Sequence, residues 1–212
     1  MRIIAGEYRG RPLKAPKGST TRPTIDRVRE SLMSTVMSAR GTWDGAIVLD
    51  AFAGSGSLGI EALSRGAAFS CFCDCDKTAL DVLAQNTSFL RPGTFSVARV
   101  DVLRRLPPRA ASPFDLVFLD PPYATDVRKT SSLLVRLRDA GMLAEGALIS
   151  FEHDKSCNPV HDSPFETLEL ELLVHKTYGA TIVDIFRYAR IVSETADDAA
   201  EDTQTKGKRG AE

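Results

Sequence analysis

The hydrophobic and polar positions follow a regular alternation through the middle of the chain. Between residues 46 and 153, short apolar runs alternate with segments in which apolar residues recur every three or four positions. The runs predict buried strands and the segments predict helices. Strands are expected at 46–52, 68–74, 95–101, 114–120 and 146–153, and helices at 57–66, 76–90 and 127–141. This order predicts right-handed βαβ units and a parallel sheet that is covered on both faces.

The flanking patterns differ from the middle. Residues 167–179 and 181–190 are two alternating runs joined around Gly179, which predicts an antiparallel hairpin at the edge of the sheet. At the other end, residues 1–18 are typical of a short basic hairpin. Residues 21–39 carry Ile25, Val28, Leu32 and Val36 at helical spacing, with Thr24 as the expected cap. The expected fold class is α/β, with a mostly parallel sheet, an antiparallel C-terminal hairpin, and a basic N-terminal hairpin and helix.

The composition fits one domain with a small appendage. The chain has 212 residues, of which 43% are hydrophobic and 26% are charged. We expect a basic appendage at 1–40, an α/β domain at 41–190, and a disordered tail at 191–212, where apolar residues are scarce. No apolar run approaches the roughly 18 residues of a membrane span, and the N-terminus lacks an apolar signal-peptide core. A cytoplasmic, monomeric protein that does not bind membranes is therefore expected.

Charge is distributed unevenly along the chain. The formal net charge is −1, yet residues 1–40 hold nine Lys and Arg against three acids, a balance of +6. Such a basic segment on a near-neutral enzyme is typical of a protein with a polyanionic substrate, although it could also be an ordinary solvated surface. The residues predicted to bind nucleic acid are Arg9, Arg11, Lys14, Arg22, Thr24, Arg27 and Arg29.

Three of the four cysteines alternate in the run SCFCDCD. On a strand, Cys71, Cys73 and Cys75 would share one face, and such a cluster could suggest a metal site. No CxxC pair or suitably spaced histidine accompanies them, so free thiols packed against the sheet are favoured. Cys157 stands apart from the cluster. No metal is predicted.

A glycine-rich loop follows the first predicted strand. Residues 54–59 read GSGSLG, a GxGxxG pattern between a strand and a helix, where glycines allow a tight turn and a close approach of ligand. The pattern alone would also suit a nicotinamide dinucleotide. Asp50, four residues before Gly54, would repel a pyrophosphate and attract an ammonium group. The loop therefore favours a ligand with an amino-acid end.

Acidic residues also end the neighbouring strands. Asp50, Asp74, Asp101 and Asp120 each close a predicted strand, and ligands of open α/β sheets bind beyond the carboxyl ends of the strands. Each acid alone could simply cap the next helix. Together they predict one crevice, in which Asp74 suits a ribose diol and Asp101 suits an adenine amino group.

These motifs resemble class I S-adenosylmethionine-dependent methyltransferases. LDAFAGSGSLGIEAL resembles their cofactor loop, and LDPPY resembles the signature of amino-nitrogen methylases. With MRIIAGEYRGRPLKAP, TRPTIDRVRESL and KTYGATIVDIFRY, the chain is similar over residues 1 to about 190 to the bacterial 16S ribosomal RNA guanine-N2 methyltransferase family. The resemblance implies that S-adenosyl-L-methionine is the cofactor, that 16S rRNA or a partly assembled small subunit is the substrate, and that the cofactor residues are Asp50, Phe52, Gly54, Gly56, Asp74, Asp76 and Asp101.

The run FLDPPY supplies the expected catalytic group, Asp120, Pro121, Pro122 and Tyr123. The lone pair of an exocyclic amine is delocalised into the base, so two hydrogen-bond acceptors at its N–H bonds would help to free it. The Asp120 carboxylate and the Pro121 carbonyl could be these acceptors, and Pro122 restricts the direction of that carbonyl. Tyr123 would stack on the extruded base. His153 is expected at a strand end on the surface, with no catalytic role.

Other functions compatible with these motifs remain open. DPPY also occurs in DNA adenine-N6 methyltransferases, and a non-catalytic rRNA-binding assembly factor could keep the fold. An NAD-dependent oxidoreductase is disfavoured by Asp50. The choice of guanine N2 depends on the family resemblance.

Overall fold

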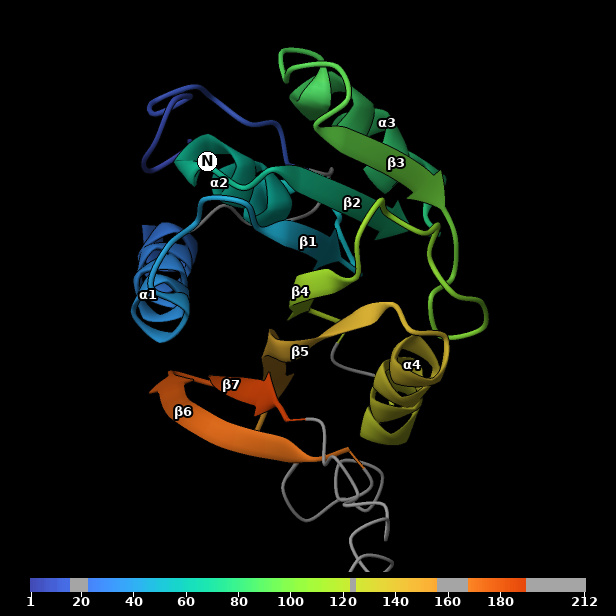
Figure 1. Ribbon diagram of the computed structural model, residues 1–212. Helices are drawn as coiled ribbons and strands as arrows, with labels where there is room; N and C mark the ends of the chain where they lie inside the picture. The colour runs from blue at the N-terminus through green and yellow to red at the C-terminus, as the bar shows by residue number, and fades with distance from the viewer. Residues whose placement is uncertain (16–22, 123–124, 156–167, 190–212) are drawn as a thin grey trace, which may run out of the picture.

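The chain forms a single mixed β-sheet with helices on both faces (Figure 1). This computed structural model describes residues 1–15, 23–122, 125–155 and 168–189, and of residues 23–26 it describes only the backbone. The sheet has seven strands in the order β3-β2-β1-β4-β5-β7-β6. The strands are β1 Ile47–Asp50, β2 Phe69–Asp74, β3 Phe95–Arg99, β4 Phe114–Leu119, β5 Leu143–Asp154, β6 Leu170–Tyr178 and β7 Thr181–Tyr188.

The predicted topology is confirmed. Strands β1 to β5 pair in parallel, whereas β7 pairs antiparallel with both β5 and β6. The C-terminal hairpin thus joins the sheet through its second strand. The helices are α1 Pro23–Arg40, α2 Ser57–Arg65, α3 Lys77–Thr87 and α4 Val127–Asp139. Their ends lie within three residues of the expected ones; the largest difference is at α3, which ends at Thr87 before Phe89 and Leu90.

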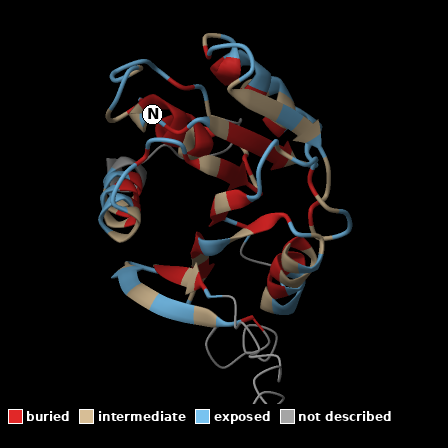
Figure 2. Cartoon of the chain, viewed as in Figure 1, coloured by how far each residue is buried: buried red, intermediate tan, exposed pale blue. Residues whose placement is uncertain are grey.

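Two apolar layers separate the helices from the sheet. Val48, Phe72 and Phe118 pack with residues of α1, α2 and α3 on one face, and Leu49 and Val117 pack with α4 on the other. Val48 and Leu49 are adjacent in β1 and point to opposite faces, as the period of a strand requires. Figure 2 shows buried residues along the strands and on the inner sides of the helices. Both faces of the central sheet are therefore covered, which explains the nearly continuous apolar runs of its strands.

The N-terminal segment is a hairpin fixed to α2. Arg2 and Pro12 form a bridge, and the buried Glu61 carboxylate accepts the backbone N–H groups of Ile4 and Ala5 at 2.9 and 3.0 Å. A Cβ on Gly6 would lie 1.7 Å from the Ser64 carbonyl oxygen, so only glycine fits there. The predicted hairpin is confirmed, and these contacts make it part of the domain rather than a free arm.

Several of the N-terminal and C-terminal predictions are corrected by the structure or fall on residues that it does not describe. Helix α1 begins at Pro23, so Thr24 is its second residue and not its cap, and the Thr24 side chain lies outside the described residues. Arg22, Cys157 and the tail at 191–212 also lie outside them. In the described part of the chain, no helix is long and apolar enough to cross a membrane.

Candidate active site

A cavity of about 1120 Å³ lies at the carboxyl ends of the parallel strands. Its walls come from the loops after β1, β2, β3 and β4, from the end of β5, and from α1 and the β6–β7 turn. The lining includes Phe52, Gly54, Asp74, Asp76, Asp101, Asp120, Pro121, Pro122, Glu152, Tyr178 and Thr181. Loops that leave the same edge of a parallel sheet meet at this position, so residues distant in sequence share one site.

The glycines of the first loop have different roles. Gly54 lines the cavity with φ +52°, and in the described part of the chain a Cβ there would meet no atom within 4 Å. Gly56, with φ +80°, faces the core instead, where a Cβ would lie 2.4 Å from the Leu83 methyl group. Gly54 therefore leaves room for a ligand, whereas Gly56 allows the loop to pack against α3 and does not line the cavity.

Asp50 lies beneath this loop and not in the cavity wall. It is 2% exposed, and its carboxylate accepts the Gly59 N–H at 3.0 Å. Burial raises the pKa of Asp50 to about 7; the Gly59 hydrogen bond opposes the shift, and the charges of Asp120 and Asp74 add to it. Asp50 therefore fixes the start of α2 and places a titratable charge behind the loop.

Asp74, at the end of β2, is held by the backbone on two sides. Its two carboxylate oxygens accept the N–H groups of Gly54 and Asp76, each at 2.8 Å. Asp76 lines the cavity as well, but its carboxylate caps α3 by accepting the Ala79 N–H at 2.8 Å. The Asp74 carboxylate is thus held in orientation at the cavity, whereas the Asp76 carboxylate stabilises the first turn of α3.

Asp101 lines the cavity in the loop that follows β3. Its carboxylate accepts the Leu103 N–H at 3.1 Å and lies 3.3 Å from Arg104 Nε. A carboxylate held in this way keeps free lone pairs for a further donor such as an amino group.

Asp120 follows β4, and its carboxylate opens into the cavity. The side chain is exposed to the cavity, although protein surrounds it on its other sides, and this desolvation raises the pKa of Asp120 to about 6. Pro121 is buried, Pro122 is exposed, and the Pro122 carbonyl accepts the Thr125 N–H at 2.8 Å. Tyr123 lies outside the described residues. The acidic and carbonyl parts of the predicted catalytic group therefore share the cavity with the glycine loop.

Glu152 is a cavity residue that the sequence reasoning missed. Leu119 pairs with Phe151 in the parallel β4–β5 ladder, so Asp120 and Glu152 are the next residues of neighbouring strands. Burial raises the pKa of Glu152 to about 8, with a further contribution from the Asp120 charge. The strand after FLDPPY was predicted correctly, and aligning the two strand ends would have placed this acid beside Asp120.

His153, next to Glu152, is buried, so its expected place on the surface is wrong. One ring nitrogen lies 3.0 Å from an Asp184 carboxylate oxygen, and the other lies 2.8 Å from the Asp154 carbonyl oxygen. Burial lowers the pKa of His153, but the Asp184 hydrogen bond and charge outweigh it and the net shift is upward. This pair joins β5 to β7 and does not line the cavity.

The predicted RNA-binding residues divide into two groups. Arg9, Arg11, Lys14 and Arg27 are exposed. Arg29, which was expected to face a partner freely, is only 3% exposed; its guanidinium donates to the Arg2 carbonyl, and the side chain lines the cavity. Arg29 is therefore not freely exposed, because the N-terminal hairpin covers this side of α1, and its RNA-binding role stays a prediction.

The three clustered cysteines do not share a face. Cys71 and Cys73 are buried with their sulfur atoms 3.9 Å apart, whereas Cys75 follows the end of β2 and is exposed at the cavity. The two buried thiols belong to the apolar layer under α4.

The chain is similar to known methyltransferases over most of its length. A family model described as "Conserved hypothetical protein 95" matches residues 1–187. Ribosomal RNA small subunit methyltransferase D of Escherichia coli is 36% identical over 159 residues, which are 73% of this chain and 75% of the relative. The solved structure "Putative methyltransferase yhhF from Escherichia coli" has 34% identity and a TM-score of 0.73, and the match covers 89% of this chain and 98% of that one.

A more distant solved structure shares the fold alone. N-methyltransferase NodS of Bradyrhizobium japonicum, in complex with S-adenosyl-L-homocysteine, has 16% identity and a TM-score of 0.62. The match covers 80% of this chain and 90% of NodS.

Proposed function

The chain belongs to the family described as Conserved hypothetical protein 95, and from this membership we propose that it methylates the N2 amino group of a guanine in 16S ribosomal RNA. It is an rRNA methyltransferase, and the lining of the cavity suits S-adenosyl-L-methionine as the methyl donor. The observation that supports the finer proposal is the placement of Asp120, Pro121 and Glu152 in one cavity with the glycine loop.

The cavity residues fit S-adenosyl-L-methionine, whose sulfonium supplies an electrophilic methyl group. Gly54 leaves open space where any larger residue would add a Cβ, as close backbone contact with the methionine end requires. Asp74 would accept from the ribose hydroxyls, with Asp76 as its neighbour and α3 cap, and Asp101 would accept from the adenine amino group. Phe52 would pack against the cofactor, and Asp50 would act through the loop and through its charge.

Asp120 and Pro121 would act on the amino group of the base. Two acceptors at the two N–H bonds draw the nitrogen toward tetrahedral geometry and make its lone pair available to the methyl carbon. As the new N–C bond forms, the methyl–sulfur bond would break and the cofactor would leave as a neutral thioether; the nitrogen, then cationic, would give one proton to Asp120. Holding the two reactants in line can contribute on the order of 7–11 kcal/mol at best. Tyr123, two residues after Pro121, is proposed to stack on the extruded base.

Glu152 supports guanine over adenine. The Watson–Crick edge of guanine presents the N1–H next to the N2 amino group, whereas adenine presents an N1 lone pair next to its amino group. The ionised carboxylate of Glu152, one strand away from Asp120, would accept from guanine N1–H and would repel the adenine lone pair. Because burial raises the pKa of Glu152 to about 8, this preference for guanine should strengthen as the pH rises through 8, although both activities use a DPPY loop.

The exposed cations Arg9, Arg11, Lys14 and Arg27 are proposed to contact the RNA backbone. They belong to the N-terminal hairpin and α1, and α1 forms one wall of the cavity. The RNA would be 16S rRNA, either free or in a partly assembled small subunit.

The proposal is tested by methylating small-subunit RNA from cells that lack the gene. The purified enzyme and labelled cofactor are incubated with this RNA or with partly assembled subunits, and the nucleosides are identified by mass spectrometry. We expect N2-methylguanosine at one position. Label in N6-methyladenosine, or transfer to duplex DNA in preference to RNA, would refute the assignment.

A further inference from the structure

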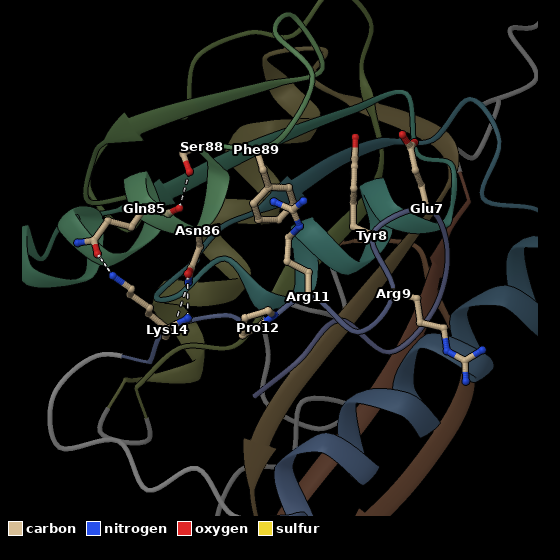
Figure 3. A pocket seen from close by; sticks show the side chains of 10 residues that line it. All are labelled: Glu7, Tyr8, Arg9, Arg11, Pro12, Lys14, Gln85, Asn86, Ser88 and Phe89. Atoms are coloured by element: carbon tan, nitrogen blue, oxygen red, sulfur yellow. Dashed lines mark hydrogen bonds between the residues drawn. The ribbon is translucent and has the colours of Figure 1, made fainter.

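A second pocket lies outside the methyl-transfer cavity, between the N-terminal hairpin and the end of α3 (Figure 3). Its volume is about 670 Å³, within the range of small-ligand sites. Tyr8, Arg9, Arg11 and Lys14 of the hairpin and Gln85 and Phe89 of the α3 end line it. Aromatic rings and cations thus line the same pocket.

An ordered stack forms the wall of this pocket. The Arg11 guanidinium carbon lies 4.2 Å from the centre of the Phe89 ring, and the Tyr8 ring meets Phe89 edge-on at 5.3 Å. Figure 3 shows the guanidinium over the face of the Phe89 ring. A planar guanidinium with one face on a ring presents its other face to a further planar group, and RNA bases stack on arginine in this way.

Hydrogen bonds also fix the position of Lys14, a cation of the same pocket. Lys14 and Asn86 exchange two hydrogen bonds at 2.9 Å, the Lys14 N–H with the Asn86 oxygen and the Asn86 amide with the Lys14 carbonyl. The Lys14 ammonium donates to the Gln85 amide oxygen at 2.6 Å. Because that partner is neutral, the charge of Lys14 is not compensated by it.

The acid at the pocket does not cancel this charge. Glu7 is the acidic residue among those that line it, and its carboxylate lies 2.8 Å from Arg91. The pocket therefore keeps the positive charge of Arg11 and Lys14, which suits a phosphodiester; Figure 3 shows the Arg9 side chain extending away from the Arg11–Phe89 stack.

We propose that this pocket binds one unpaired nucleotide of the RNA substrate, with its base on the outer face of Arg11 and its phosphate at Lys14. This inference rests on the proposed rRNA methyltransferase function. Asn86 also donates to the Ser55 carbonyl at 2.8 Å, and Ser55 follows Gly54 in the cofactor loop. The pocket thus adjoins the active site through α3, and one RNA chain would contact both.

The test compares three variants of the full-length enzyme with a matched control. Arg11→Gln removes both the positive charge and the guanidinium that stacks on Phe89. Arg11→Lys keeps the charge but removes the planar guanidinium, and Phe89→Leu keeps an apolar side chain without the ring. Arg128→Gln removes an exposed cation from α4, which lies on the other face of the sheet. Binding of small-subunit RNA is measured, and the melting temperature and cofactor affinity show that each variant folds.

Loss of one stacked base is worth about 1–3 kcal/mol, so each of the three variants should bind RNA about 5- to 160-fold more weakly. Arg128→Gln should change binding less than twofold. Ultraviolet cross-linking of wild-type enzyme to the RNA should attach nucleotides to peptides containing Tyr8 or Phe89. Equal affinity for wild type, Arg11→Lys and Phe89→Leu, or cross-links only elsewhere, would overturn the proposal.

Two further outcomes separate this inference from its premise. If wild type methylates rRNA while the variants bind it normally, only the pocket assignment fails; if wild type does not methylate rRNA, the proposed function fails. A polyglutamate probe that binds with the same dependence on Arg11 and Phe89 would point to an acidic protein partner and overturn the RNA assignment.

Discussion

The carboxylate of Asp50 accepts the backbone N–H of Gly59 at 3.0 Å, beneath the loop that lines the cofactor side of the cavity. The bond joins the end of β1 to the first turn of α2. Asp50 is buried, and its pKa is raised to about 7, so near neutral pH the protein keeps a carboxylate where burial disfavours its charge. A group that is costly for folding and close to the ligand site suggests a functional reason for the charge.

Replacing Asp50 with Asn should stabilise the protein at pH 8 and weaken cofactor binding. Asn still accepts the Gly59 N–H but is neutral. A raised carboxyl pKa means that the free energy of unfolding falls as the pH rises from the ordinary carboxyl value, about 4, toward 7, so the gain should be clearly smaller at pH 5 than at pH 8. We expect the free energy of unfolding to rise by about 0.5–2 kcal/mol at pH 8, measured by thermal or urea unfolding. Equal gains at both pH values would show that charge is not the cause.

The same variant should distinguish the cofactor from its product. S-adenosylmethionine carries a sulfonium charge that S-adenosylhomocysteine lacks, so Asp50→Asn should lose about tenfold affinity for the former and less for the latter. Calorimetry on both ligands at pH 8 gives the comparison. Equal losses would mean that Asp50 acts only by fixing the loop.

Replacing Asp74 with Asn should weaken cofactor binding more than Asp76→Asn does. Asp74 is held toward the cavity by the N–H groups of Gly54 and Asp76, whereas Asp76 caps α3. We expect at least tenfold weaker binding for Asp74→Asn, since hydrogen bonds to charged groups are worth about 1.5–3 kcal/mol. Asp76→Asn should keep most of the affinity, because Asn also caps helices well. The reverse order in a calorimetric titration would assign the ribose to Asp76.

Methyl transfer should fall as the pH drops below about 6. Protonated Asp120 is a weaker acceptor for the amine N–H and cannot take the product proton, and its pKa is raised to about 6. The dependence of kcat/KM on pH between 5 and 8 measures this, with cofactor affinity followed in parallel because Asp50 titrates nearby. Asp120→Ala should abolish transfer with nearly unchanged cofactor binding. A large loss of cofactor affinity would instead assign Asp120 to the cofactor site.

The fold and the cofactor loop could be predicted from the sequence because they depend on local patterns. Apolar runs and glycine spacing predicted the central strands, and the acids after them predicted the cavity. Whether a residue faces the cavity or the core could not be predicted from such local patterns. Gly54 and Gly56 are two residues apart in one motif, yet one faces the cavity and the other faces Leu83.

Arg29, His153 and Glu152 illustrate the same limit. Arg29 is off the apolar stripe of α1, but the hairpin covers it, a contact between segments distant in sequence. His153 is buried because Asp184, on β7, pairs with it. Predicting that Glu152 lies beside Asp120 required the register of β4 against β5, which neither segment shows by itself.

Replacing Glu152 with Gln should reduce methyl transfer to RNA at least tenfold without weakening cofactor binding. The neutral amide is a poorer acceptor for guanine N1–H, and it can turn a donor toward that group instead. In wild type the raised pKa, about 8, predicts that the KM for RNA falls as the pH rises from 7 to 8.5, because the ionised carboxylate is the better acceptor. Glu152→Gln should lose this pH dependence.

The matched control for that variant is Glu145→Gln, which changes an exposed acid on the same strand outside the cavity. It should keep wild-type kinetics, so that a general effect of charge on RNA binding is excluded. Steady-state kinetics with small-subunit RNA at three pH values measures all three proteins. If Glu152→Gln behaves like Glu145→Gln, the carboxylate does not read the guanine edge, and the preference for guanine must come from the residues around Tyr123.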